Sequence, residues 1–300
     1  MKNKTHTILE SILMYSNFHN NEWKKKLDED GYIVVKNSKY MKKNLKILKK
    51  KSSDLIRKEG DKGGWEGKEK FYKKGKKFES GAQRLGGLIK KDKSFLGLIT
   101  IPEILISAYH VIKDEIKVCG LNLRNPVAGS GEQSIHFDGF PRYNKKDRFA
   151  GIVAFIYLDD TNIKNGAMRL IPKTHKHLGW PDDHISINKK HPKEIRVKVK
   201  AGTIVIANLN LWHAGAKNFN GKSRRVIMMN IKNRKYDQLL NYKKFLGTKF
   251  IEKLNDNEKY LLAVRKSDKN QKIDSGGSAN QLRREYFKNK NRKFTSVANN

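Results

Sequence analysis

Apolar residues change their spacing along the chain, from a helical period in the first part to short strand-like runs in the second. Helical spacing, with Pro102 at one helix start, predicts helices at residues 20–30, 38–60 and 102–118. From residue 151 onward, short apolar runs alternate with turn dipeptides, which predicts strands at residues 152–158, 167–171, 195–199, 203–207 and 226–231. The Gly- and Lys-rich residues 61–79 are expected to form a loop.

Three side chains have the types and the order of a metal site. His136 and Asp138 lie two positions apart, so an extended strand would point both toward one site and Phe137 toward the other side. His213 follows another apolar run and is expected to be the third ligand. Two imidazoles and one carboxylate are the ligand set of non-heme Fe(II) oxygenases. This set leaves the other coordination positions of the metal open. A His-x-Asp pair alone is a weak signal in a chain with 9 histidines, and the order of strands and ligands strengthens it.

A candidate anion-binding arginine follows the third ligand. A polar turn around Asn220-Gly221 is expected to return the chain as a strand, which brings Arg224 back beside the metal. A guanidinium presents a planar fork of donors that suits a carboxylate, whereas lysine offers a point charge. Arg225 competes for this role, because alternation along the strand lets only one of the two point inward.

Four motifs in this order resemble those of the phytanoyl-CoA dioxygenase family of Fe(II)/2-oxoglutarate oxygenases. They are DEDGYIVVK at residues 28–36, LRNPVAGSGEQSIHFD at 123–138, NGAMRLIPKTH at 165–175 and AGTIVIANLNLWHAGAKNFNGKSRR at 201–225. The resemblance covers most of residues 27–235. It implies Fe(II) and 2-oxoglutarate as cofactors, with iron ligands His136, Asp138 and His213, and cosubstrate-binding residues Arg224, Gln133 and Phe155. No catalytic residue is expected beyond the metal centre.

The same resemblance carries one further implication and two departures. Related halogenases have Ala or Gly where this chain keeps Asp138, so hydroxylation is favoured over halogenation. Lys173 replaces a turn glycine, and we expect an ordinary φ there. Gly215 stands where some relatives have a serine that contacts the cosubstrate, so that contact would be missing.

The expected fold class is α+β, a double-stranded β-helix (cupin-like jelly roll) braced by N-terminal and C-terminal helices, because several short strands in succession suit a rolled sheet around the metal motif. Four regions are predicted in the chain. They are a mostly helical region packing on the core sheet (residues 1–120), the metal-binding jelly roll (121–235), a C-terminal helical segment (236–266) and a basic polar tail, expected to be disordered (267–300).

Charge and cysteine content narrow the expected partners and location. The net charge of +35 comes from 65 basic and 30 acidic residues, and most of the excess is Lys in segments such as residues 42–77 that fit an amphipathic helix with a solvated face. Aromatic residues are not interleaved with arginines as in a stacking groove, so a nucleic-acid partner is not expected. The single Cys119 excludes an intrachain disulfide and favours a reducing compartment. With no signal peptide or long apolar segment recognised, we expect a cytoplasmic protein without a membrane span, and a monomer.

The leading hypothesis is therefore an oxidoreductase that uses dioxygen to hydroxylate a small organic molecule while 2-oxoglutarate is decarboxylated to succinate. One alternative keeps the chemistry but makes a nucleic acid the substrate, and another is a non-catalytic jelly-roll binding protein. His175 is expected to be structural or to contact the residues that bind the metal, rather than to bind the metal itself. The polar residues 173–194 fit either a loop over the site or a solvent-exposed insertion.

Overall fold

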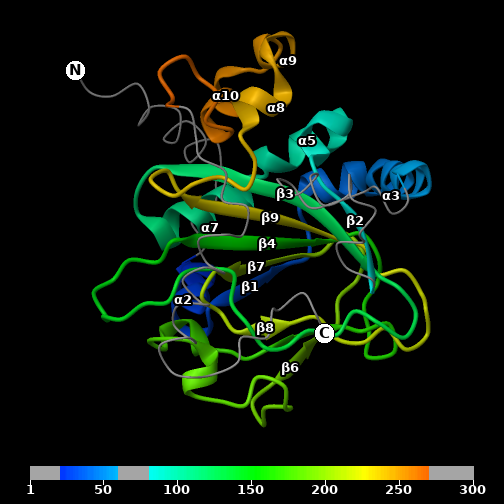
Figure 1. The fold of residues 1–300 in the computed structure, drawn as a ribbon, viewed down its shortest axis with the longest axis vertical. Helices are drawn as coiled ribbons and strands as arrows, with labels where there is room; N and C mark the ends of the chain where they lie inside the picture. Colours follow the sequence, from blue (N-terminus) through cyan, green and yellow to red (C-terminus); the bar gives the residue numbers. More distant parts are fainter. Residues whose placement is uncertain (1–20, 60–80, 270–300) are drawn as a thin grey trace, which may run out of the picture.

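Two antiparallel sheets form the centre of the molecule, shown in Figure 1 with the larger sheet across the middle and the smaller one below it. The computed structural model describes residues 21–59 and 81–269. The larger sheet has the order β1 (Tyr32–Val35), β7 (Ile204–Asn208), β4 (Gly151–Tyr157), β9 (Val226–Asn233), β3 (Ile116–Pro126) and β2 (Ala82–Leu85). The smaller sheet has the order β6 (Ile195–Val197), β5 (Met168–Leu170) and β8 (His213–Ala214).

Helices cover one face of the larger sheet and pack beside its strand β3 (Figure 1). The helices before β3, with β1 and β2 between them in the chain, are α2 (Asn21–Asp30), α3 (Lys39–Glu59), α5 (Leu88–Lys91), α6 (Lys93–Leu96), the 3-10 helix Gly97–Thr100 and α7 (Pro102–Ile112). After β9 come α8 (Tyr242–Leu246), α9 (Thr248–Glu252) and α10 (Asp256–Leu261), the orange group at the top of Figure 1.

Strand alternation divides the apolar side chains between two cores. In β4, Ile152, Ala154 and Ile156 pack with the helices in the larger core. Val153 and Phe155 point the other way and pack with side chains of the smaller sheet. Every residue of β4 is buried, so this strand reads as a continuous apolar run in the sequence. The double-stranded β-helix braced by helices at both ends is confirmed.

Two elements differ from the sequence-based predictions. The helix predicted at residues 102–118 ends at Ile112, where Lys113 adopts a left-handed φ of 51°, and Ile116 already begins β3. The apolar residues after Lys113 fit both a helical and a strand period, which explains the error. The strand expected around residues 134–138 is reduced to a single β-bridge between His136 and His213.

The four predicted regions of the chain stay a prediction. Residues before 121 supply β1, β2 and the start of β3 to the larger sheet, in addition to helices. The loop predicted at residues 61–79 and the tail from residue 270 onward lie outside the described residues.

No single helix among the described residues is long and apolar enough to cross a membrane. One bent pair, residues Lys93–Thr100 with Pro102–Ile112, meets that test only when its two members are taken together.

Candidate metal and cosubstrate site

The backbone brings the three candidate metal ligands together through a short ladder between distant segments. The amide of His136 donates to the carbonyl of His213 at 3.0 Å, and the amide of His213 donates back at 2.8 Å. The amide of Asp138 donates to Leu209 at 2.9 Å. These bonds fix the His136–Asp138 segment beside the start of β8, although it forms no regular strand.

The ligand atoms of His136, Asp138 and His213 all lie within 4.8 Å of one another. The two carboxylate oxygens of Asp138 face one imidazole each, at 3.8 Å from His136 Nε2 and 3.6 Å from His213 Nε2. The Asp138 side chain is 30 % exposed, against 11 % and 6 % for the two histidines, so one side of the group opens toward solvent.

Both imidazoles are held in the tautomer that a metal requires. Nδ1 of His136 lies 2.9 Å from the carbonyl of Ser134, and Nδ1 of His213 lies 2.9 Å from the carbonyl of Leu211. A carbonyl only accepts, so each Nδ1 donates its proton there, and the tautomer of the neutral ring with this bond has its Nε2 lone pair available for a cation. Two imidazoles in this tautomer and one carboxylate fit a divalent iron and leave part of its coordination open.

Phe137, between the two ligands, points away from them, as expected from the alternation of side chains along an extended segment. Its ring stacks on Trp180 at a centroid distance of 5.0 Å and an interplanar angle of 9°. Trp180, Ile135 and Trp212 belong to the same small apolar cluster. This cluster packs behind the ligand segment and holds it in place.

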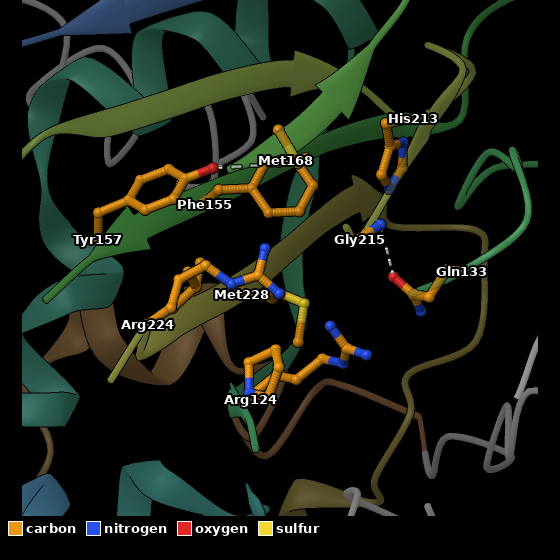
Figure 2. Close-up of a pocket in the computed structure, with 11 residues that line it drawn as sticks. Arg124, Gln133, Phe155, Tyr157, Met168, His213, Gly215, Arg224 and Met228 are labelled. Carbon is orange, nitrogen blue, oxygen red and sulfur yellow. Dashed lines mark hydrogen bonds between the residues drawn. The ribbon is translucent and has the colours of Figure 1, made fainter. Parts of the chain in front are cut away.

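A small cavity of about 50 Å³, partly open to solvent, adjoins His213 (Figure 2). Its lining combines apolar side chains with a few polar groups, as in many small-ligand sites. The residues are Arg124, Pro126, Gln133, Phe155, Tyr157, Met168, His213, Gly215, Arg224, Val226 and Met228.

Three residues implicated by the sequence meet in this cavity. The Phe155 ring stands edge-on to His213 at 5.3 Å. The Gln133 side-chain oxygen accepts a hydrogen bond from the amide of Gly215 at 2.9 Å. Arg224, just before β9, reaches into the cavity and donates to the carbonyl of Gly166.

The two competing arginines lie in different environments. Arg225 forms a two-pronged ion pair with Asp159, with Nε and Nη2 at 2.8 and 2.7 Å from its two oxygens. It also donates to α3 through the carbonyl of Lys49 and the hydroxyl of Ser53. Only Arg224 of the two lines the cavity beside His213.

Arg124 and Tyr157 also line the cavity, although neither belongs to the candidate site residues predicted from the sequence. Burial raises the pKa of the Tyr157 hydroxyl, while the nearby Arg224 charge opposes that effect, so Tyr157 stays protonated across the physiological range. A signal for Arg124 was present, because a charged residue that directly follows the alternating apolar positions Leu121 and Leu123 needs a polar environment.

The two departures from the family pattern have different outcomes. The expectation of an ordinary φ at Lys173 is wrong, since its φ is 69°. Its amide donates to the carbonyl of Asp30 at 2.9 Å, and Thr174 Oγ1 donates to Ile171, which holds the turn in this shape. At Gly215, an added Cβ would lie 2.7 Å from the Gln133 side-chain oxygen, so this wall has no room for a side chain.

The loop from residue 173 to residue 194 packs on the back of the ligand segment. The amide of Ile135 donates to Ile187, and the Ser134 hydroxyl donates to Asn188. His175 lies apart from the metal group, buried with Nε2 at 3.2 Å from the carbonyl of Asp28. Burial lowers the pKa of His175 to about 4, so this ring is neutral at physiological pH.

Comparisons with known proteins agree with this geometry. The family model for phytanoyl-CoA dioxygenase (PhyH) matches residues 27–226. Uncharacterized proteins of Mycobacterium tuberculosis and Mycobacterium bovis are each 26 % identical over 190 residues, which are 60 % of this chain and 65 % of theirs.

Solved structures share the fold at low sequence identity. HygX of Streptomyces hygroscopicus with nickel and 2-oxoglutarate bound has a TM-score of 0.56 at 12 % identity, covering 76 % of this chain and 94 % of its own. The carbocyclase SnoK from nogalamycin biosynthesis, described as α-ketoglutarate-dependent, has a TM-score of 0.54 at 16 % identity, covering 72 % and 85 %. The epimerase SnoN, in complex with Fe3+, α-ketoglutarate and nogalamycin RO, has a TM-score of 0.55 at 14 % identity, covering 84 % and 93 %.

Proposed function

The chain belongs to the phytanoyl-CoA dioxygenase family, and from that premise we propose that it is an Fe(II)/2-oxoglutarate-dependent dioxygenase that hydroxylates a small organic molecule. The observation that carries the proposal is the convergence of His136, Asp138 and His213, with both Nε2 atoms directed at one carboxylate, beside a cavity that holds an arginine. The chain spans about 65 % of the length of its mycobacterial relatives. The activity of the whole protein is therefore also a proposal.

Each group in the site has a definite task under this proposal. His136, Asp138 and His213 hold Fe(II), and Arg224 binds the distal carboxylate of 2-oxoglutarate. When bound, iron and 2-oxoglutarate supply oxidising power that amino-acid side chains lack. Phe155 and Met168 line the cavity with apolar surface, which limits water around the cosubstrate and strengthens its ionic contacts.

Hydroxylation is the proposed outcome because Asp138 occupies the carboxylate position of the ligand set. The solved structures with this fold include a carbocyclase and an epimerase, so C–H oxidation on this fold has more than one outcome. Mass analysis of the product separates these outcomes, since hydroxylation adds one oxygen atom to the substrate.

A small-molecule substrate is proposed by analogy with HygX, which has been solved with hygromycin B bound, and SnoN, solved with nogalamycin RO. The nucleic-acid alternative predicts binding to DNA or RNA that weakens steeply with salt and substrate-dependent succinate release with either polymer. The non-catalytic alternative predicts no turnover of 2-oxoglutarate with any compound. Monomeric state and cytoplasmic location stay predictions.

The direct experiment measures succinate formed from 2-oxoglutarate in the presence of Fe(II), oxygen and a library of small metabolites. We expect a subset of compounds to stimulate succinate release and to gain mass. D138A should abolish the stimulated release, and E132Q, which neutralises an exposed carboxylate close in the sequence, should retain it. Equal release by wild-type protein and D138A would contradict the proposal.

A further inference from the structure

We propose that Arg124 binds the distal carboxylate of 2-oxoglutarate together with Arg224, so that the cosubstrate pocket contains two guanidinium groups. This inference rests on the proposed function. It adds a residue to the proposed iron ligands and Arg224.

The register of the sheet places Arg124 on the inner wall of the cavity. In the pairing of β3 with β9, Arg124 stands opposite Val226, and both residues line the cavity with Met228. Their neighbours Leu123 and Ile227 face the opposite way, into the core beneath the helices. The alternation that buries Leu123 therefore directs the Arg124 side chain toward the cavity.

The guanidinium of Arg124 is held at the wall nearest the metal group. Its Nη2 donates to the carbonyl of Gly131 at 3.1 Å. Its Nη1 would lie 2.9 Å from a Cβ at Gly215, two residues after the ligand His213. Figure 2 shows Arg124 reaching toward Gln133 and Gly215, with Arg224 entering the same space from beside Tyr157. Donors fixed in this way lose little freedom when an anion binds.

The charge around this wall favours an anionic ligand. Arg124 stands directly opposite Arg84 in the pairing of β3 with β2, and both side chains are at most 6 % exposed. The described residues that line the cavity include Arg124 and Arg224 and no carboxylate. The guanidinium groups of Arg124 and Arg224 on the cavity wall are the type of donor that suits a carboxylate entering with the ligand.

The proposal predicts which part of the ligand Arg124 recognises. 2-Oxopentanoate has the same five-carbon 2-oxo acid chain as 2-oxoglutarate but ends in a methyl group. It keeps the end that binds iron and lacks the distal carboxylate. Losing a contact to the distal carboxylate should therefore weaken 2-oxoglutarate and leave 2-oxopentanoate unaffected.

The test titrates each ligand into the Fe(II)-loaded protein without oxygen and follows the visible charge-transfer band. For R124M, we expect the Kd of 2-oxoglutarate to rise about 10- to 100-fold, the range for a lost charged hydrogen bond, while that of 2-oxopentanoate stays within about twofold. R124K keeps the charge but loses the fork, and should raise the 2-oxoglutarate Kd by less than R124M. The control R148M removes an exposed arginine remote from the cavity lining and should change neither Kd.

Two results would overturn the assignment of Arg124. One is an unchanged 2-oxoglutarate Kd in R124M, and the other is an equal loss for both ligands, which would mean that Arg124 only supports the loop at Gly131. If R124M does not fold, an R124K protein that binds both ligands as tightly as wild type would also overturn the assignment. A wild-type protein that gives no band with 2-oxoglutarate would instead contradict the proposed function, and this inference with it.

Discussion

Replacing Arg225 by methionine should destabilise the fold strongly while leaving cosubstrate binding intact. Arg225 pairs with Asp159 through two hydrogen bonds of 2.7 and 2.8 Å, and both side chains are nearly buried, at 10 % and 12 % exposed. The same guanidinium donates to Ser53 at 2.5 Å and to the Lys49 carbonyl at 3.0 Å, and so ties α3 to the start of β9.

The expected magnitude follows from leaving Asp159 buried without its main partner. Removing one member of a buried ion pair costs about 3–5 kcal/mol, because the remaining charge has lost both its water and its partner. For a domain of this size, each kcal/mol lowers the Tm by roughly 2–4 °C, so we expect a fall of about 6–20 °C. Lys49, 3.6 Å from Asp159, places the result toward the lower end.

The pH dependence of this effect gives a second measurement. Burial alone would raise the pKa of Asp159, but hydrogen bonds from Arg225 outweigh burial and hold that pKa below its usual value. A lowered folded-state pKa stabilises the protein above the unfolded-state pKa of about 3.9, and that stability is lost as pH falls through the folded-state pKa. In R225M burial raises the pKa instead, so protonation relieves the buried charge and the difference from wild type should shrink as pH falls toward about 4.

Thermal and urea unfolding of wild type, R225M and the double variant R225M/D159L would test this account. The double variant removes both charges and should be less destabilised than R225M. The 2-oxoglutarate Kd of R225M, measured below its Tm, should match that of wild type. A stable R225M protein with weakened 2-oxoglutarate binding would show that Arg225, and not Arg224, is the cosubstrate arginine.

Three further predictions concern single positions. R224M should raise the 2-oxoglutarate Kd about 10-fold or more and leave the Fe(II) Kd within about twofold, as measured by anaerobic titration, and unchanged 2-oxoglutarate binding would refute the role of Arg224. K173G should stabilise the protein by roughly 0.5–1 kcal/mol in urea unfolding, because glycine relieves a left-handed φ of 69°, and a loss of stability would mean that the lysine side chain matters more. Burial lowers the pKa of His175 to about 4 in the folded protein, so between pH 6.5 and pH 4 the unfolded chain binds more protons than the folded protein. Wild type should therefore lose stability as pH falls through this window. H175F should have a flatter pH profile of Tm there, and parallel profiles would exclude His175 as the cause.

One part of the candidate site could be predicted from the sequence because its geometry is local. His136 and Asp138 are separated by one residue, and alternation alone places Phe137 on the opposite side, where Trp180 covers it. Their convergence with His213 depends on a ladder between distant segments, which only the order of the motifs suggested.

The missed features depend on tertiary contacts that no periodicity encodes. Arg124 faces the cavity because of the register between β3 and β9, and its neighbours in the sequence do not fix that register. Lys173 adopts a left-handed φ because contacts with Asp30 and around Thr174 hold the turn, overriding the preference of lysine. The different environments of Arg224 and Arg225 depend on the position of α3, whose Ser53 and Lys49 accept from Arg225.

The most direct measurement of the metal centre is an anaerobic equilibrium titration with Fe(II), comparing wild type, H213A and H191A. We expect wild type and H191A to bind one Fe(II) per chain with similar Kd, because His191 is outside the metal group, and H213A to bind more than about 100-fold more weakly. Iron binding of equal strength in H213A and H191A would contradict the assignment of His136, Asp138 and His213 as one ferrous site.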